Sequence, residues 1–255
     1  MKNKLPLLLF SALVLILSCG KNTPTEDPES CPPIILLSKI SGTTNLDFTY
    51  VDRTRLVKIK DGEKSTEVFY TEGSFDYTFK FQYLDNTGTT AKGKVVDVRS
   101  MMNDFKPGEE IESNYEGNQL KFQSKISYTY TEESITRTQT RLDDNSVIIQ
   151  KYTLKNNNIA SLDNGSGIIY TYKYDDKRNP LANRILKYRM GSIDFFSANS
   201  VVEVEENQNG MRKIIKNTYT YNQDGYPLTM KSVNNEGTIV ADYKFEYSIL
   251  PGGCY

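Results

Sequence analysis

The residues of this chain best suited to catalysis are pairs of neighbouring carboxylates. Two carboxylates held about 5–9.5 Å apart across a cleft can hydrolyse a glycosidic bond. Neighbours on a strand point to opposite faces of a sheet, however, and the chain has no histidine to serve as a general base. We therefore predict no catalytic residue and no enzymatic activity, with an envelope glycan hydrolase as the alternative. The pairs are Glu109/Glu110, Glu132/Glu133, Asp143/Asp144, Asp175/Asp176 and Glu205/Glu206.

The sequence gives no strong indication of a metal site. No two of the three cysteines have a spacing typical of metal ligands. Asp175 and Asp176 are able to join a calcium site with neighbouring carbonyl oxygens, but a solvated turn is the simpler interpretation. We predict no metal and no cofactor.

The first 19 residues have the pattern of an export signal. Lys2 and Lys4 precede an almost wholly apolar run from residue 5 to residue 17. A basic start, a short apolar run and a small residue before the cut are typical of a secretory signal. The sequence Ile16-Leu17-Ser18-Cys19 resembles the lipobox of bacterial lipoproteins, which implies cleavage before Cys19 and lipid on that cysteine. An ordinary signal with a chance cysteine is the alternative.

These features divide the chain into three parts. Residues 1–18 are the expected signal peptide, residues 19–33 are the lipidated Cys19 and a flexible tether, and residues 34–255 form a single β-rich repeat-like domain. The tether is polar and proline-rich. Gly20, rather than aspartate, follows Cys19 and favours anchoring at the outer membrane, on either its periplasmic or its outer face.

The net charge argues against a nucleic-acid partner. The chain carries −1, and removal of Lys2 and Lys4 lowers this by two, to −3. A nucleic-acid-binding domain needs a basic patch. We expect the partners to be the membrane, through the lipid on Cys19, and a glycan or protein ligand.

Cys31 and Cys254 lie at the two ends of the expected domain. The export compartment permits disulfides. The two residues are therefore candidates for a bridge, and two free thiols are the alternative.

The rest of the chain predicts a mainly β fold. Short runs rich in Tyr, Phe, Ile, Val and Thr alternate between apolar and polar residues, as in Tyr77–Tyr83 and Tyr243–Tyr247. Turn signals such as Asn209-Gly210 and Asp224-Gly225 separate them. We expect an antiparallel meander of successive hairpins, forming a large twisted or rolled sheet. One or two short helical insertions are expected, at residues 181–196 and more weakly at residues 100–105.

Pairs of tyrosines recur along the chain. YTYKYDDKRNPL begins at residue 170, and TYTYNQDGYPL begins at residue 218. Each places two rings on one face of a strand, followed by a turn and a Pro-Leu pair. Packing across strands is the first interpretation, and a binding face is the alternative. The candidate binding-face residues are Tyr172, Tyr174, Tyr219 and Tyr221.

The same motifs carry a family resemblance. Tyr172-x-Tyr174-Asp175 and Tyr219-x-Tyr221-Asn222 resemble the YD repeats of the RHS class. Together with the lipobox, they resemble uncharacterised Bacteroidota lipoproteins with a YD-like β domain. The resemblance implies hairpin architecture and an envelope location, and it supplies no catalytic residue.

The sequence therefore predicts a membrane-anchored lipoprotein of the cell envelope. We expect it to be a binding or scaffold module for a glycan, lipid or protein. The alternatives are the glycan hydrolase and a periplasmic lipid carrier, in which a curved sheet encloses an apolar cavity.

Overall fold

The structure is a computed structural model that describes residues 34–51, 55–70, 79–85, 92–101, 106–182 and 196–250. The chain divides into two compact units. One comprises residues 1–34 and 251–255, of which only Ile34 is described. The other, Ile35–Leu250, forms the barrel.

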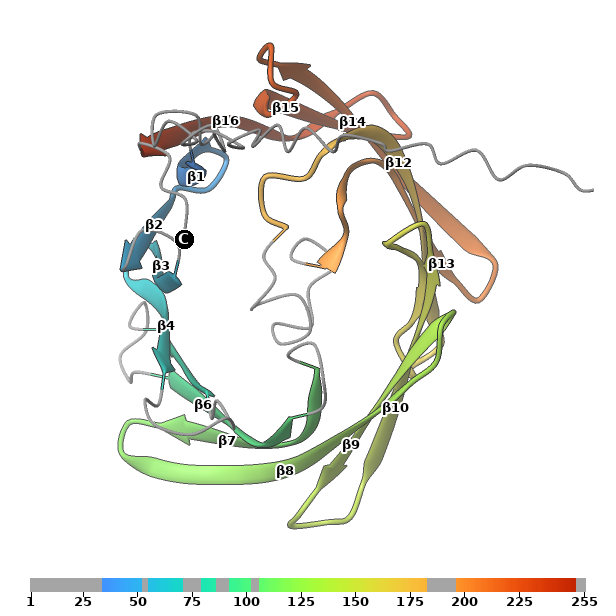
Figure 1. The fold of residues 1–255 in the computed structure, drawn as a ribbon. Coiled ribbons are helices and arrows are strands. Elements are labelled where there is room, and N and C mark those ends of the chain that lie inside the picture. The colour runs from blue at the N-terminus through green and yellow to red at the C-terminus, as the bar shows by residue number, and fades with distance from the viewer. Residues whose placement is uncertain are drawn as a thin grey trace, which may run out of the picture. The chain divides into compact units, whose positions relative to one another are not determined.

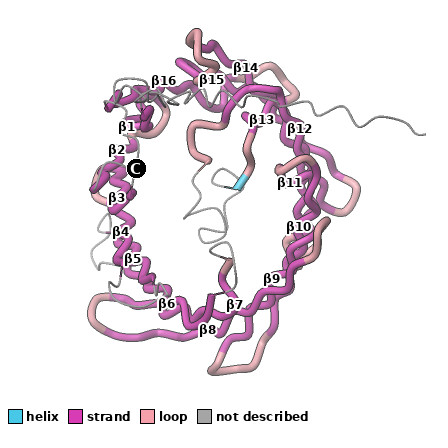
Figure 2. Tube along the Cα trace, in the orientation of Figure 1, coloured by secondary structure: helices cyan, strands magenta, loops and turns pink. Residues whose placement is uncertain are grey.

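Sixteen described strands make up the barrel wall. They are β1 (Ile34–Gly42), β2 (Leu46–Val51), β3 (Arg55–Asp61), β4 (Lys64–Tyr70), β5 (Phe79–Asp85), β6 (Lys92–Met101), β7 (Pro107–Glu116), β8 (Gln119–Tyr130), β9 (Ser134–Arg141), β10 (Val147–Lys155), β11 (Asn158–Asp163), β12 (Ile168–Arg178), β13 (Asn199–Gln208), β14 (Met211–Tyr221), β15 (Pro227–Asn234) and β16 (Ile239–Leu250). Each strand lies beside its neighbours in sequence, and β1 lies beside β16 (Figures 1 and 2). The sheet is therefore closed, with no open edge.

The contact between β1 and β16 joins the two ends of the domain. The backbone N–H of Thr43 donates to the carbonyl oxygen of Asp242 at 2.9 Å, and the N–H of Asp242 donates to Thr43 Oγ1 at 2.8 Å. Ser38 Oγ donates to the carbonyl oxygen of Glu246 at 3.0 Å. Gly42 has φ +134°, and a Cβ there would overlap the Asp242 carbonyl oxygen. A glycine at residue 42 therefore allows the two strands to approach.

Closure corrects the fold expected from the sequence. The sheet is a closed barrel rather than an open, twisted or rolled sheet with helical insertions. All described elements of the chain are strands. Residues 183–195 and 102–105, which hold most of the two expected helical stretches, lie outside the described residues. A meander is built from local pairings, whereas closure depends on a contact across about 200 residues, which no local pattern encodes.

The tight hairpins follow the expected turn chemistry. Asn209 and Gly210 join β13 to β14 with φ of 52° and 85°. These values fit a two-residue hairpin turn, which needs positive φ at both central residues. Asn222 Oδ1 accepts hydrogen bonds from the N–H groups of Asp224 and Tyr226, at 3.0 and 2.9 Å. Asparagine and glycine thus set where these strands end.

Two hydrophobic clusters form the core. The first joins β1, β2, β3, β4, β6 and β16, and its buried residues are Leu37, Ile40, Phe48, Leu56, Ile59, Val68, Val98 and Phe245. The second joins β9, β10, β11 and Phe196, and its buried residues are Ile135, Tyr152, Ile159 and Phe196. Along β2, for example, the buried Phe48 lies between the exposed Asp47 and Thr49.

Candidate ligand cavity in the barrel interior

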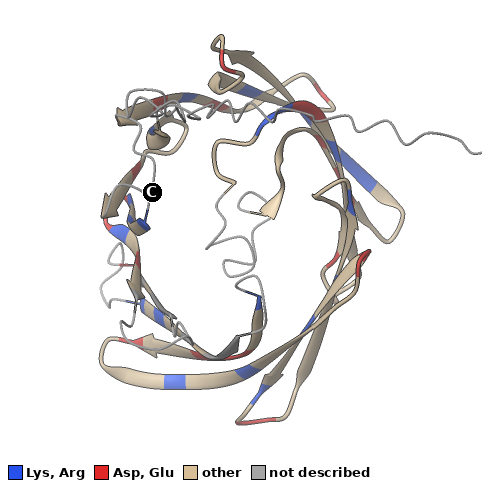
Figure 3. Cartoon of the chain, viewed as in Figure 1, with Lys and Arg blue, Asp and Glu red and all other residues tan. Residues whose placement is uncertain are grey.

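The outward faces of the strands carry charged side chains among exposed apolar ones such as Ile149, Ile169 and Ile215. On β16, Tyr243 and Phe245 line an interior cavity, so the exposed Lys244 and Glu246 face outside. The same alternation puts an exposed lysine near the middle of six strands: Lys125, Lys151, Lys173, Lys216, Lys231 and Lys244. Charged residues occur on strands around the ring (Figure 3). Each lysine at a bilayer midplane costs about 2–4 kcal/mol, so six would cost roughly 12–24 kcal/mol. These lysines favour water over lipid at the strands that carry them.

Some of these lysines bind carboxylates on the neighbouring strand. Lys125 Nζ lies 2.6 Å from Glu109 Oε2, and Lys173 Nζ lies 2.8 Å from Glu203 Oε1. The hydrogen bond raises the pKa of Lys173 and lowers the pKa of Glu203. Such exposed pairs contribute little to stability. Their significance is that they keep the outer wall hydrophilic.

The interior contains an apolar cavity of about 250 Å³. Its wall comes from β1, β2 and β13 to β16, together with the turn that follows β12. The lining residues are Ile40, Thr44, Leu46, Asn179, Pro180, Leu181, Val201, Val204, Asn217, Tyr219, Met230, Tyr243 and Phe245. None of these lining residues is charged. A cavity of about 150 Å³ lined by apolar side chains is enough to bind benzene, so this one has room for a larger apolar group.

Two polar side chains of the cavity wall, those of Asn217 and Tyr219, bind the backbone or a neighbouring side chain. Asn217 Nδ2 donates to the carbonyl oxygen of Val201 at 2.8 Å, and the Tyr219 hydroxyl donates to the same oxygen at 3.0 Å. Asn217 Oδ1 accepts a hydrogen bond from Ser232 Oγ at 2.7 Å. Because these groups already have partners, the wall offers a ligand mainly apolar contact.

The four tyrosines predicted as a binding face all belong to the packed wall of the barrel. Tyr219 lines the cavity, and its ring stacks on that of Tyr221 with a centroid distance of 5.7 Å. Tyr172 packs against the second hydrophobic cluster. The Tyr174 hydroxyl donates to the carbonyl oxygen of Ile159 at 2.7 Å. The structure thus places one of the four, Tyr219, at the cavity.

A repeated hydrogen bond explains part of the tyrosine pattern. In five hairpins, a tyrosine hydroxyl on the second strand donates to a carbonyl oxygen on the first. The pairs are Tyr50 to Leu37 at 2.9 Å, Tyr130 to Pro107 at 2.9 Å, Tyr174 to Ile159 at 2.7 Å, Tyr219 to Val201 at 3.0 Å and Tyr247 to Pro227 at 2.7 Å. Each bond fixes the relation of two strands where the rings pack. The tyrosine repeat is therefore an architectural device.

The two sharp motif copies also contact each other. The Tyr221 hydroxyl of the second copy donates to Asp175 Oδ2 of the first. Burial and this carboxylate together raise the pKa of Tyr221. The Arg178 guanidinium of the first copy lies over the Tyr226 ring of the second, 5.4 Å from its centroid. These side chains connect β12 to β14 across the intervening β13.

The hydrogen bond of Tyr50 predicts a stability change at alkaline pH. Burial raises the pKa of Tyr50 from 10.0 to about 12. Since the folded pKa is the higher one, the contribution of this group is complete below pH 10 and is lost as the pH rises toward 12. We expect Tyr50→Phe to cost about 1 kcal/mol at neutral pH and to lose less stability than the wild type from pH 10 to 12. Urea unfolding midpoints across this range measure both effects, and equal losses in the two proteins would contradict the assignment.

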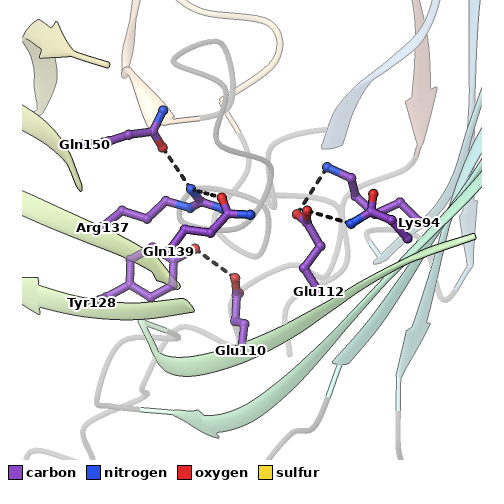
Figure 4. A network of polar contacts seen from close by, with 8 residues as sticks. Lys94, Glu110, Glu112, Tyr128, Arg137, Gln139 and Gln150 are labelled. Carbon is purple, nitrogen blue, oxygen red and sulfur yellow. Dashed lines mark hydrogen bonds and ion pairs between the residues drawn. The ribbon is translucent and has the colours of Figure 1, made fainter. Parts of the chain in front are cut away.

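A polar network lies on the inner face of β6 to β10, apart from the cavity lining (Figure 4). Glu112 is bound by Lys94 at 3.1 Å and by Asn114 at 3.1 Å. The Tyr128 hydroxyl donates to Glu110 Oε2 at 2.8 Å, and burial with the Glu110 charge raises the pKa of Tyr128.

On β9, the neighbouring strand to β8, Arg137 Nη1 donates to Gln139 and Gln150 at 2.9 and 3.0 Å. The guanidinium also lies close enough to the Tyr128 hydroxyl to lower the pKa of that group in part. The charged side chains of this network thus interact with other residues of the same network.

The carboxylate pairs are separated by the sheet where they lie on strands. Glu109 meets Lys125 on the outer face, whereas Glu110 is 1% exposed and faces inward. Glu205 binds Arg212 and Glu206 binds Lys213, both on the neighbouring strand β14. Among the described residues, no group of three or more carboxylates or cysteines is placed to hold a metal ion. Cys19, Cys31 and Cys254 lie outside the described residues, so lipidation and the disulfide remain predictions.

Most cavity residues carry no chemical signature in the sequence. Val201, Val204 and Met230 are ordinary apolar residues of strands, and sequence reasoning missed them. The available signal was the contrast between the two faces of each strand, with lysines on one and aromatic rings on the other. That contrast identifies the buried face, but it does not locate a cavity.

Comparison with known proteins shows similarity of fold. No family model and no curated protein matches the chain. A porin-like protein from Bacteroides vulgatus matches with a TM-score of 0.52 and 11% identity, covering 84% of this chain and 99% of that one. A porin-like protein from Bacteroides uniformis matches with a TM-score of 0.47 and 12% identity, covering 88% of this chain and 100% of that one. The barrel is porin-like in fold.

This similarity corrects the family resemblance expected from the tyrosine motifs. The Bacteroides vulgatus structure that the barrel matches is of a porin-like protein, and the resemblance to YD repeats of the RHS class is wrong. The tyrosine motifs misled because the same spacing serves hairpins in a closed barrel. Among the described residues, no helix is both long and apolar enough to cross a membrane.

Proposed function

We propose that this chain is a lipid-anchored protein of the outer membrane whose water-facing barrel binds an apolar chain in its interior. The observation that carries the proposal is an uncharged cavity of about 250 Å³ inside a barrel with a charged outer wall. The porin-like fold supports an outer-membrane location. The lipobox-like sequence ending at Cys19 supports the anchor.

Around the cavity, on β13 to β16, the arrangement of faces is the reverse of that in a membrane-spanning barrel, which is apolar outside and polar inside. Tyr243 and Phe245 face the cavity, whereas Lys244 and Glu246 between and beside them face solvent. A barrel of this kind shields apolar material from water. An acyl or isoprenoid chain is a ligand class that needs such shielding, and transport or presentation of a lipid follows from it.

The cavity chemistry favours an apolar chain over a glycan. Ligand sites place a few polar groups where a polar ligand needs them. Here the amide of Asn217 and the hydroxyl of Tyr219 are bound to Val201 and Ser232. A sugar would have to replace those bonds, whereas an apolar chain leaves them intact. Binding of this kind requires no catalytic group.

Filling the cavity tests the proposal. Met230 lines the cavity, and Lys231 beside it is exposed on the outer wall. We expect Met230→Trp to weaken binding of an apolar naphthylamine dye at least about tenfold, because the larger ring occupies the ligand volume. We expect the matched control Lys231→Trp to change the affinity less than about twofold. The assay is dye fluorescence in the mature chain with Cys19→Ser, with saturated fatty acids as competitors.

Two outcomes would overturn the proposal. One is a wild-type chain that does not bind the dye, or that binds it but does not release it when fatty acids are added. The other is an equal effect of the two tryptophans, which would place the dye on the surface. Circular dichroism of both variants controls for loss of the barrel.

A further inference from the structure

A turn that follows β12 lines two apolar cavities in the interior. The first is the cavity of about 250 Å³ described above, and the second has about 80 Å³. Pro180 and Leu181 line both. The second cavity is otherwise lined by Ile35, Leu36, Leu37, Phe48, Tyr50, Leu56 and Ala182, without a charged residue.

The turn is fixed by its own hydrogen bonds. The N–H of Ala182 donates to the carbonyl oxygen of Asn179 at 3.2 Å, and the N–H of Leu181 donates to Asn179 Oδ1 at 3.0 Å. Asn179 Nδ2 donates to the carbonyl oxygen of Ser197 at 2.8 Å, which ties the turn to the chain leading into β13. Pro180 occupies the second position of the turn, where its fixed φ is favourable. These hydrogen bonds therefore fix the position of the Leu181 backbone.

The side chain of Leu181 packs against the first hydrophobic cluster. Because Leu181 lines both cavities, it lies at the boundary between them. The second copy of the motif shows that this is no general property of the Pro-Leu pair. There Pro227 begins β15, and Leu228 is 43% exposed.

We propose that Leu181 determines the length of the apolar chain that the barrel accepts, an inference that rests on the function proposed above. A chain entering the larger cavity meets Leu181 at the boundary with the smaller one. Short apolar chains fit in front of this side chain, and longer ones are excluded. The ligand class is a linear acyl chain, because a linear group can extend from one cavity into the other.

Changing the size of residue 181 tests the inference. Leu181→Ala removes three carbon atoms and is expected to admit saturated fatty acids about three methylenes longer than the wild type accepts. Each added methylene that becomes buried improves Kd about fourfold. Leu181→Phe is expected to shift the limit to shorter chains. The measurement is displacement of the naphthylamine dye by fatty acids of increasing length, in the mature chain with Cys19→Ser.

Leu228→Ala is the matched control, because it makes the same change in the second motif copy away from both cavities. We expect its chain-length limit to equal that of the wild type. A limit that stays unchanged in both Leu181 variants, or a wild type without any limit, would overturn the inference while leaving the function proposed above intact. Absence of fatty-acid binding by the wild type would overturn both this inference and the function proposed above. If Leu181→Ala fails to fold, the chain-length limit of Leu181→Phe still tests the inference.

Discussion

Replacing Gly42 by alanine is expected to open the barrel. Gly42 has φ +134°, a conformation that costs a residue with a Cβ about 1–3 kcal/mol. The new methyl group would also overlap the Asp242 carbonyl oxygen, which accepts the Thr43 N–H bond in the closing contact. Overpacking of this kind costs about 1–3 kcal/mol. We expect a loss of about 3 kcal/mol in the free energy of unfolding, measured from urea midpoints.

A matched glycine separates strain from closure. Gly237 has φ +78°, but a Cβ there would meet no atom within 4 Å. Gly237→Ala should therefore cost only the strain, about 1 kcal/mol. Gly42→Ala should in addition expose the edges of β1 and β16, and unpaired edges associate with other chains. Size-exclusion chromatography detects that association, and equal behaviour of the two variants would contradict a special role for residue 42.

The strands of this fold were open to prediction because their signal is local. Alternation such as Tyr243-Lys-Phe-Glu-Tyr247 predicts a strand with one dry face, and β16 has that pattern. The closure of the sheet into a barrel could not be predicted from local patterns. It depends on Thr43 meeting Asp242, 199 residues away, and a twisted sheet satisfies the same local pattern. Sequence reasoning therefore identified strands and hairpins but assembled them into the wrong sheet.

The candidate site shows a second limit of local patterns. Asn179-Pro180-Leu181 and Tyr226-Pro227-Leu228 look like copies of one motif, and the sequence treats them alike. In the structure the first is a turn that lines the cavity, and the second begins β15, a strand of the barrel wall. What differs is the long connection of residues 179–198 between β12 and β13, which frees the first copy from a strand. Tyr219 was singled out from its repeat, but Val204 and Met230 acquire a role only through the assembled barrel.

Replacing Cys19 should abolish attachment of lipid to the chain. If the lipobox resemblance holds, Cys19 carries two or three acyl chains, and each buried methylene contributes about 0.8 kcal/mol to membrane binding. Growth with an alkyne fatty acid should label the wild-type chain and leave Cys19→Ala unlabelled. Cys31→Ala is the control, since it removes a cysteine 12 residues further along the same expected tether. Label on Cys19→Ala, or its loss from Cys31→Ala, would contradict lipidation at residue 19.

A second variant separates an anchored barrel from a membrane-spanning one. Here residues 1–18 are replaced by a plain secretory signal, and Cys19 is replaced by alanine, so that neither lipid nor signal holds the chain. Lys125, Lys173 and Lys244 on the outer wall would each cost about 2–4 kcal/mol at a bilayer midplane. We therefore expect this chain to leave the membrane fraction and to appear in the soluble periplasmic fraction. A chain that stays in the outer membrane would mean that the wall itself lies in lipid. The charged outer faces would then have to be covered by a partner, and the barrel would not be the water-facing carrier proposed above.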